Sequence, residues 1–374
     1  MAVCSLSPTD FTGSASASAM VMDPQDAPLV DDELTYLVVF GALDGDITGE
    51  SDGTHGPFES FTGTGFRLYD RATSAKAMVY VKGACHNRFN TNWGTERAVI
   101  TTDSTLLTAT RHQDVSTFYV GGFFRCFVGG EHTLKRRFTG DIKAPAGITV
   151  ALQWSGGTNA ALGLGEVRRL DTFENATNNE FGLARVMPFG SVITFGDLQV
   201  NGVPQGPSVP HQTSIIHADL TVNIPVPRVL LDELPFPLTA SSNWDGFEFL
   251  LFRLGRWFDL NTRPFTGKLP HVRVSLRDDA GTEVTATEAD FFPRNVPGLP
   301  FLHEARTFDN LENPLPALLQ LTFLRLETVR IPLSLFKKRG IDLTKVRAVG
   351  ISLQQTDNMH VFIDSLEIVS IVGL

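Results

Sequence analysis

The sequence predicts two architectures in one chain: an α/β segment, followed by a larger antiparallel β-sandwich of the jelly-roll type. Residues 34–145 alternate continuous apolar runs with stretches of helical spacing, which is the order of parallel strands joined by crossover helices. Residues 146–374 instead hold about ten short runs of alternating polar and apolar residues, separated by Gly, Pro, Asn and Asp. Residues 1–33 are rich in Ser, Ala and Asp, and we expect them to form a loose lead-in.

Length and composition fit a soluble, folded protein of two domains. The 374 residues are enough for two cores, and 42% hydrophobic and 19% charged residues are values of globular proteins. No apolar run reaches the roughly 18 residues that span a bilayer. A net charge of -10 argues against a nucleic-acid partner. Cys4, Cys85 and Cys126 are too few and too scattered for a disulfide framework or a zinc site.

Two apolar runs in the α/β segment end in Gly-rich turns that carry an acid or a histidine. The first, LVVFGALDGD, ends at Asp44 and Asp46, and the second, AMVYVKGACHNRFNTNW, delivers His86 just past its end. Helical spacing follows over residues 115–129. Buried strands that deliver polar residues at their carboxyl ends build the catalytic sites of open α/β sheets. In a nucleophilic hydrolase the histidine takes the proton of the nucleophile, and the carboxylate holds the imidazole in the correct tautomer.

These residues carry a resemblance to a known family. The stretches VVFGALDGDI, FRLYDRA, VYVKGACHNRFNTNW and FFRCFVGG resemble the carboxyl-terminal third of bacterial α/β-hydrolases of the esterase, lipase and polyester-hydrolase type. The resemblance implies hydrolysis of carboxylic esters without a cofactor, with Asp44 as the triad acid, Asp46 as the alternative acid and His86 as the triad histidine. It also implies a secreted or cell-surface location, although the first 33 residues lack an export signal.

The chain departs from that family at the nucleophile. The family serine sits in a G-x-S-x-G elbow between a strand and a helix, and this sequence has no such motif. Ser14, Ser16 and Ser18 lie in GSASASA, with no strand before them and no apolar helix after them. We therefore expect the nucleophile outside this sequence. A sheet cut after its nucleophile leaves an open inner edge, so we also expect a complement, either an upstream segment or a separate chain.

Short alternating runs make up the β-rich region. In the run 271–277 the apolar residues at 272, 274 and 276 face one way, and the polar residues between them face the other. About ten such strands make an antiparallel sandwich. The runs expected to form strands are 148–154, 167–173, 191–195, 215–224, 246–256, 271–277, 284–291, 328–332, 346–353 and 361–368.

The last forty residues carry a second resemblance. TVRIPLSLFKKRGIDLTKVRAVGISLQ followed by HVFIDSLEIV resembles the end of carbohydrate-binding-type jelly rolls with a galactose-binding-like fold. In these a strand ending Ile-Pro-Leu leads to a short helix, an Asp-Leu-x-x-Val step and a final strand with Ile-Asp-x-Leu. Such modules often hold a structural calcium between the first and last strands. Asp171 and Glu174, paired with Asp364, are the oxygen ligands that the resemblance implies here, and solvated strand-end acids are the alternative.

Sugar binding needs exposed aromatic residues on a concave face or a loop rim. Trp244, Trp257, Phe291 and Phe292 are available, although aromatic residues in alternating strands are more often core residues.

Three functions follow from these observations. The first is a serine-hydrolase-like protein that acts on an ester, with an appended jelly-roll domain for binding to substrate or a surface. The alternative is a non-catalytic carbohydrate- or surface-binding protein, in which the hydrolase remnant serves as packing. The third is an inactive scaffold subunit paired with another chain. The expected partners are an ester or polysaccharide substrate and a chain that covers the open sheet edge, with no nucleic acid and no membrane span.

Overall fold

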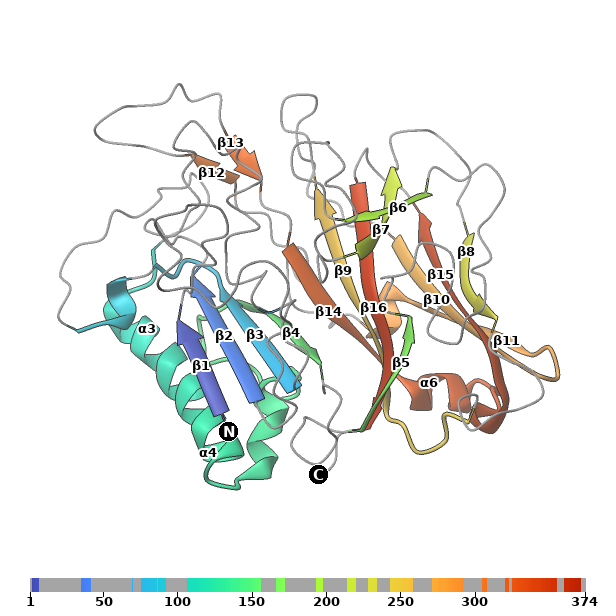
Figure 1. Ribbon diagram of the computed structural model, residues 1–374, viewed down its shortest axis with the longest axis horizontal. Helices are drawn as coiled ribbons and strands as arrows, with labels where there is room; N and C mark the ends of the chain where they lie inside the picture. The colour runs from blue at the N-terminus through green and yellow to red at the C-terminus, as the bar shows by residue number, and fades with distance from the viewer. Residues whose placement is uncertain are drawn as a thin grey trace, which may run out of the picture.

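The computed structural model describes a mixed four-stranded sheet with its helices and a two-sheet sandwich (Figure 1). The described residues are 2–6, 35–41, 69, 75–85, 87–91, 106–155, 166–171, 193–197, 214–219, 228–233, 243–257, 271–291, 305–307, 320–322, 325–354 and 360–370.

The first sheet has four strands in the order β1-β2-β3-β4. The strands β1, β2 and β3 are parallel, whereas β4 runs antiparallel to β3. Every residue of β2 is buried, and so is every residue of β3 except Lys76, as the two continuous apolar runs predict for a sheet covered on both faces. The bounds are β1 Ala2–Leu6, β2 Thr35–Gly41, β3 Ala75–Val81 and β4 Val150–Ser155.

Helical segments cover one face of this sheet. A continuous helix comprises α3 (Ala109–Val115), the π-helical turn η2 (Ser116–Gly121) and α4 (Gly122–Phe127), and the 3-10 helix η3 (His132–Arg137) follows it. Val115, Tyr119 and Phe123 recur at helical spacing and are buried in one cluster with the strand residues Leu37 and Val79. The predicted helix at 115–129 is therefore confirmed.

The sandwich consists of two antiparallel sheets. The smaller one has the order β11-β10-β15-β8, and the larger one has the order β14-β9-β16-β7-β6, with β5 also paired to β16. The bounds are β5 Glu166–Asp171, β6 Ile193–Asp197, β7 Ser214–Asp219, β8 Arg228–Glu233, β9 Phe249–Trp257, β10 His271–Asp278, β11 Glu283–Thr287, β14 Arg325–Pro332, β15 Val346–Gln354 and β16 His360–Ser370. The remaining elements are η1 Asn87–Phe89, α5 Glu288–Phe291, α6 Leu333–Lys338, η5 Leu343–Lys345 and the separate pair β12 Ala305–Thr307 and β13 Gln320–Thr322.

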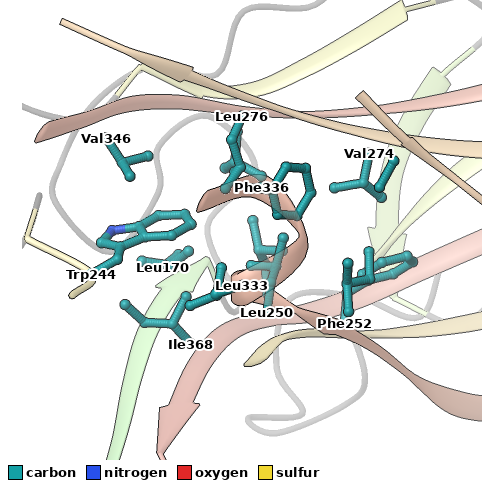
Figure 2. Packing of buried hydrophobic residues seen from close by; sticks show 14 of the residues in the cluster. Leu170, Trp244, Leu250, Phe252, Val274, Leu276, Leu333, Phe336, Val346 and Ile368 are labelled. Carbon is teal, nitrogen blue, oxygen red and sulfur yellow. The ribbon is translucent and has the colours of Figure 1, made fainter. Parts of the chain in front are cut away.

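Side chains from both sheets fill the space between them. Leu250, Phe252 and Ile368 from the larger sheet meet Val274 and Leu276 from the smaller one in a single cluster (Figure 2). Fully burying an aliphatic or aromatic side chain contributes about 1.5–3 kcal/mol, so this cluster is the main source of stability for the sandwich. The predicted jelly-roll-type sandwich is confirmed at the level of two packed antiparallel sheets.

One expected strand belongs to another sheet, and another divides into a strand and a helix. The run 148–154 was expected to open the β-rich region, but it lies in β4, which pairs with β3 and extends the first sheet. The run 284–291 divides into β11 and the short helix α5, because Asp290 accepts hydrogen bonds from the backbone amide and hydroxyl of Thr287 and ends the strand there. In the described part of the chain, no helix has the length and apolar character needed to cross a membrane.

The first sheet packs against the outer face of the larger sandwich sheet. Leu251 and Val369 point away from the sandwich core and belong to the cluster that contains Val79 and Trp154. Polar contacts surround this seam: Gln153 Oε1 accepts from Arg253 Nε at 2.9 Å, and the backbone N–H of Trp154 donates to Thr328 Oγ1 at 3.2 Å. The strand β4 therefore joins the two parts of the molecule, next to the edge strand β14 (Figure 1).

Candidate functional site

The carboxyl ends of β2 and β3 meet in a close backbone contact. A Cβ atom added to Gly41, the last residue of β2, would lie 2.6 Å from the carbonyl oxygen of Ala84 in the loop after β3. Real Cβ atoms do not approach a carbonyl this closely, so only glycine lets the end of β2 reach this loop. The end of β2 and the loop after β3 therefore lie side by side.

Backbone hydrogen bonds fix the loop after β3. Gly83 has a φ of 72°, and its carbonyl oxygen accepts from the backbone N–H of Leu107 at 2.7 Å. The backbone N–H of Lys82 donates to the carbonyl of Thr149 at 3.0 Å. This loop is thus tied to the segment before α3 and to the residue that precedes β4.

His112, on α3, completes the set of contacts. Its side chain is fully buried, and its Nε2 atom accepts a hydrogen bond from the backbone N–H of Cys85 at 2.9 Å. Its Nδ1 atom lies 2.9 Å from the carbonyl oxygen of Thr108. A carbonyl only accepts, so Nδ1 carries the proton and the imidazole is the neutral Nδ1–H tautomer. Burial, which disfavours the charged ring, lowers the pKa of His112, and the nearby Arg88 lowers it further, against hydrogen bonds that raise it.

The short helix η1 lies on the other side of position 86. The ring of Phe89 meets His112 edge to face, with 4.9 Å between ring centroids. The guanidinium of Arg88 donates to the carbonyl of Leu107. His112 therefore contacts the chain on both sides of position 86, at Cys85 and at Phe89.

The predicted triad residues lie outside the described residues. Asp44 and Asp46 follow Gly41 by three and five positions, and His86 stands in the sequence between Cys85 and Asn87. Ser14, Ser16 and Ser18 also lie outside them. The triad assignment therefore stays a prediction, while the ends of its two strands are described.

His112 was not among the residues predicted from the sequence. A single histidine on an amphipathic helix gives no signal of its own, and its partners Cys85 and Thr108 become visible only when the loop and the helix start are placed together.

Two of the three predicted calcium ligands, Asp171 and Asp364, lie on the paired strands β5 and β16. Asp171 is fully buried at the end of β5 and is in register with Leu366 of β16, two positions beyond Asp364. Glu174 lies outside the described residues. Among the described residues, no three His, Cys, Asp or Glu side chains form a group suited to a metal ion. The calcium site therefore stays a prediction.

The predicted aromatic binding residues separate into core and face positions. Trp244 is fully buried in the sandwich core, which is the alternative that the sequence left open for it (Figure 2). Phe291 is half-buried and packs against the same core. Phe292 lies outside the described residues. Trp257 ends β9 in the larger sheet and remains the aromatic candidate.

The strand register shows which residues are paired with the end of β9. Leu254 is a core residue, whereas Arg253 contacts Gln153 of the first sheet, so successive residues of β9 face opposite sides of the sheet there. Residues directly opposite in antiparallel strands share a face. One cross-strand row therefore holds Trp257, His360 and Asp219, and the next holds Gly255, Phe362, His217 and Thr194.

Comparison with known proteins identifies no family. No family model and no curated protein matches the chain. Among solved structures, the family 11 carbohydrate-binding module of a cellulosomal cellulase of Clostridium thermocellum is 9% identical, with a TM-score of 0.30, over 55% of this chain and 95% of that one. A family 30 module from the same organism is 14% identical, with a TM-score of 0.26, over 51% of this chain and 100% of that one. A xylan-binding domain of Paenibacillus barcinonensis is 10% identical, with a TM-score of 0.26, over 56% and 97%. Values this low assign neither a family nor a function.

Proposed function

We propose that this protein binds carbohydrate through the outer face of the larger sandwich sheet, without catalysis. The observation that carries the proposal is the backbone register of β9, β16 and β7. It pairs Trp257 with His360, and His360 with Asp219, and it pairs Phe362 with both Gly255 and His217 on the neighbouring antiparallel strands. Aromatic residues beside hydrogen-bonding groups are the combination that a sugar ring needs, because one face of the ring is apolar and its edge carries hydroxyls.

The order of the last elements supports the same proposal. The strand β14 ends Ile331-Pro332, the helix α6 follows at once, and η5 begins after Asp342. The strands β15 and β16 then pair in different sheets of the sandwich. This is the succession that the resemblance to carbohydrate-binding-type jelly rolls implies.

In this proposal the first sheet serves as packing. Besides the contact of Arg253 with Gln153, Ser155 Oγ lies 3.4 Å from both carboxylate oxygens of Glu367, and Arg330 forms an ion pair with Asp141 at 2.7 Å. These contacts occupy the outer face at one end, over the rows that contain Arg253 and Glu367. The rows that contain Trp257 and Gly255 lie further along β9 and form the proposed binding region.

A binding screen tests this function. The intact protein is run through native gels that contain soluble neutral or acidic polysaccharides, and retardation measures affinity. We expect retardation by at least one polysaccharide, and a loss of about tenfold or more in affinity for Trp257→Ala, as a buried Trp at the centre of an interface contributes. Phe124→Ala is the matched control, because Phe124 is an aromatic residue on α4 that is 41% exposed. Equal retardation of the two variants would contradict the proposal.

Ester hydrolysis is the second candidate, and the contact between Gly41 and Ala84 favours it. That contact brings together the starts of the two turns that carry Asp44 and His86 in the sequence. In this reading Asp44, or Asp46, orients His86, and His86 acts as the general base toward a serine outside this sequence. The coding sequence upstream of Met1 tests it: an in-frame strand and G-x-S-x-G elbow supports the candidate, and an immediate stop codon together with no cleavage of p-nitrophenyl esters contradicts it.

We further propose a structural calcium between β5 and β16, held by Asp171, Glu174 and Asp364. The pairing of these two strands supports it, because calcium takes six to eight oxygen ligands and carboxylates are the strongest of them. The ion would hold the first and last strands of the sandwich together and would take no part in chemistry.

A further inference from the structure

We propose that the turn between α4 and η3 docks on the surface of a bilayer that contains anionic lipid. The inference goes beyond carbohydrate binding, and it concerns a region that neither resemblance assigns. It rests on exposed apolar side chains that lie beside positive charges without an acidic partner in the described part of the chain.

The first observation is the exposure of this turn. Residues 128–133 are all exposed, and they link the end of α4 to the start of η3. Gly130 has a φ of 76°, and the backbone N–H of Glu131 donates to the carbonyl of Arg125 at 3.0 Å. In Figure 1 the end of α4 and the turn after it lie at the lower edge of the molecule. The turn is therefore held in one conformation and is accessible to a flat surface.

The second observation is that apolar side chains gather on this segment. Of the five large hydrophobic residues that are exposed in the described part of the chain, three lie within residues 124–142: Phe124, Val128 and Ile142. Val128 is the most exposed of the five, at 70%. Its backbone N–H donates to the carbonyl of Phe124, so the two side chains lie one turn apart on the same side of the helix. Exposed apolar groups of this kind mark a surface that an apolar phase can cover.

The third observation is the charge of the same segment. Residues 125–143 carry five Lys or Arg and two Asp or Glu, in a chain whose net charge is -10. Both acidic residues already form ion pairs, with Arg125 and Arg330. Arg136 and Lys143 are exposed, and neither has an acidic partner among the described residues. The segment therefore presents positive charge that the protein itself does not neutralise.

A second basic run, on α6, provides a contrast. There Lys337 pairs with Asp245 at 2.7 Å, and Arg339 pairs with Asp290 at 2.6 Å. Lys338 is exposed between them, but α6 carries none of the exposed large hydrophobic residues of the described chain. Only the segment around the α4–η3 turn combines unpaired cations with exposed apolar side chains.

An anionic bilayer fits this combination better than another protein does. Lys and Arg are attracted by anionic headgroups, and apolar side chains at the same level enter the boundary of the acyl chains. A second copy would place the same positive charges against each other. A stable protein interface needs about 800 Å² on each side, and three side chains on this segment are too few for it. The negative charge of the whole chain also favours an approach through this turn, since an anionic surface repels the rest.

Flotation with vesicles tests the proposal. The intact protein is mixed with vesicles of phosphatidylcholine alone or with about 30% phosphatidylserine, and the bound fraction is separated in a sugar-free density gradient. The apolar variant combines Phe124→Ser with Val128→Ser, and the charge variant combines Arg136→Gln with Lys143→Gln. All four residues are exposed, so we expect both variants to fold. The vesicles contain no glycolipid, so the result does not depend on carbohydrate binding.

Two variants elsewhere are the matched controls. Leu6→Ser removes an exposed apolar side chain from β1, and Lys338→Gln removes an exposed cation from the basic run of α6. Neither residue belongs to the proposed surface, so we expect both controls to bind vesicles as the wild-type protein does.

We expect the wild-type protein to float with the anionic vesicles, and to lose this binding without phosphatidylserine or in about 1 M salt, where the screening length is about 3 Å. Affinity for the anionic vesicles should fall about tenfold or more in the charge variant and about fivefold or more in the apolar variant. No flotation of the wild-type protein, or an unchanged affinity in either variant, would overturn the proposal. Self-association that Val128→Ser abolishes, or retardation by an acidic polysaccharide that Arg136→Gln abolishes, would also overturn it if flotation is absent.

Discussion

At the scale of single residues, Gly41 is a position where the neighbouring backbone leaves no space for a side chain. We predict that Gly41→Ala destabilises the protein by about 1–3 kcal/mol, because its Cβ would meet the carbonyl of Ala84 at 2.6 Å and force the two strand ends apart. The free energy of unfolding in urea measures the effect. Gly121→Ala is the control: it is a helical position whose nearest atom would be 3.9 Å away, so we expect no loss of stability there. Equal costs at both positions would contradict the account of the β2 end.

His112 also makes stability depend on pH. Burial lowers its pKa in the folded protein, so the unfolded chain binds more protons between the folded pKa and the ordinary value of about 6.5. The contribution is therefore fully present above about pH 6.5 and is lost as the pH falls below it. Arg88 is the neighbouring charge that opposes protonation. We predict that urea unfolding between pH 7.5 and pH 5 shows a shallower loss of stability in His112→Gln than in the wild-type protein. An identical pH dependence would show that His112 does not carry this effect.

At the scale of elements, the pairing of β5 with β16 carries the calcium prediction. Calcium in millimolar excess should raise the melting temperature by several degrees, since an ion at 100 times its Kd adds about 2.7 kcal/mol to a folded state that binds it. Asp364→Asn should remove most of this rise. Asp279→Asn is the control, because Asp279 lies in the β10–β11 turn and contacts Lys345. Differential scanning calorimetry with calcium and with a chelator measures it, and a melting temperature that ignores calcium would contradict the site.

The sequence predicted where the strands and the helix lie along the chain better than it predicted which elements pack or pair with one another. The continuous apolar run at 37–41 and the alternation at 272, 274 and 276 predict buried strands, because the side-chain period of a strand is visible in the sequence itself. The place of β4 was not visible, since an alternating run fits any half-buried sheet. Trp244 is a second example. From the sequence, an aromatic residue can belong to a sugar site or to the core, and only its burial in the structure shows that Trp244 belongs to the core. The candidate site was predictable as two strand ends, whereas His112 was not, because its partner Cys85 is 27 positions away.

At the scale of the whole molecule, the seam along β4 determines whether the two parts unfold together. Arg253 is 7% exposed and Gln153 is 2% exposed, so their hydrogen bond is shielded from water. We predict that Arg253→Ala and Gln153→Ala are coupled by about 0.5–1 kcal/mol or more in a double-mutant cycle of unfolding free energies. The pair Arg125 and Glu131, both exposed on α4 and beyond it, should show much weaker coupling. Additive effects at the seam would indicate that the two parts are energetically independent.

The same seam limits where a ligand binds. The strand β4 occupies the outer face of the larger sheet over the rows of Arg253 and Glu367, so a glycan chain is expected further along β9 and β16. The arrowheads of β2 and β9 point to the same end of the molecule (Figure 1), so the strand ends that precede Asp44 and His86 and the Trp257 row lie toward one end.

Carbohydrate binding on the outer face is the central claim, and one titration tests it most directly. Backbone amide shifts of the intact protein are followed as the most retarding polysaccharide, or an oligosaccharide derived from it, is added. The account predicts that the largest changes cluster at Gly255, Trp257, His360, Phe362 and His217, which the register places together. Saturable changes that cluster on the smaller sandwich sheet, or no changes at all with any glycan of the panel, would contradict it.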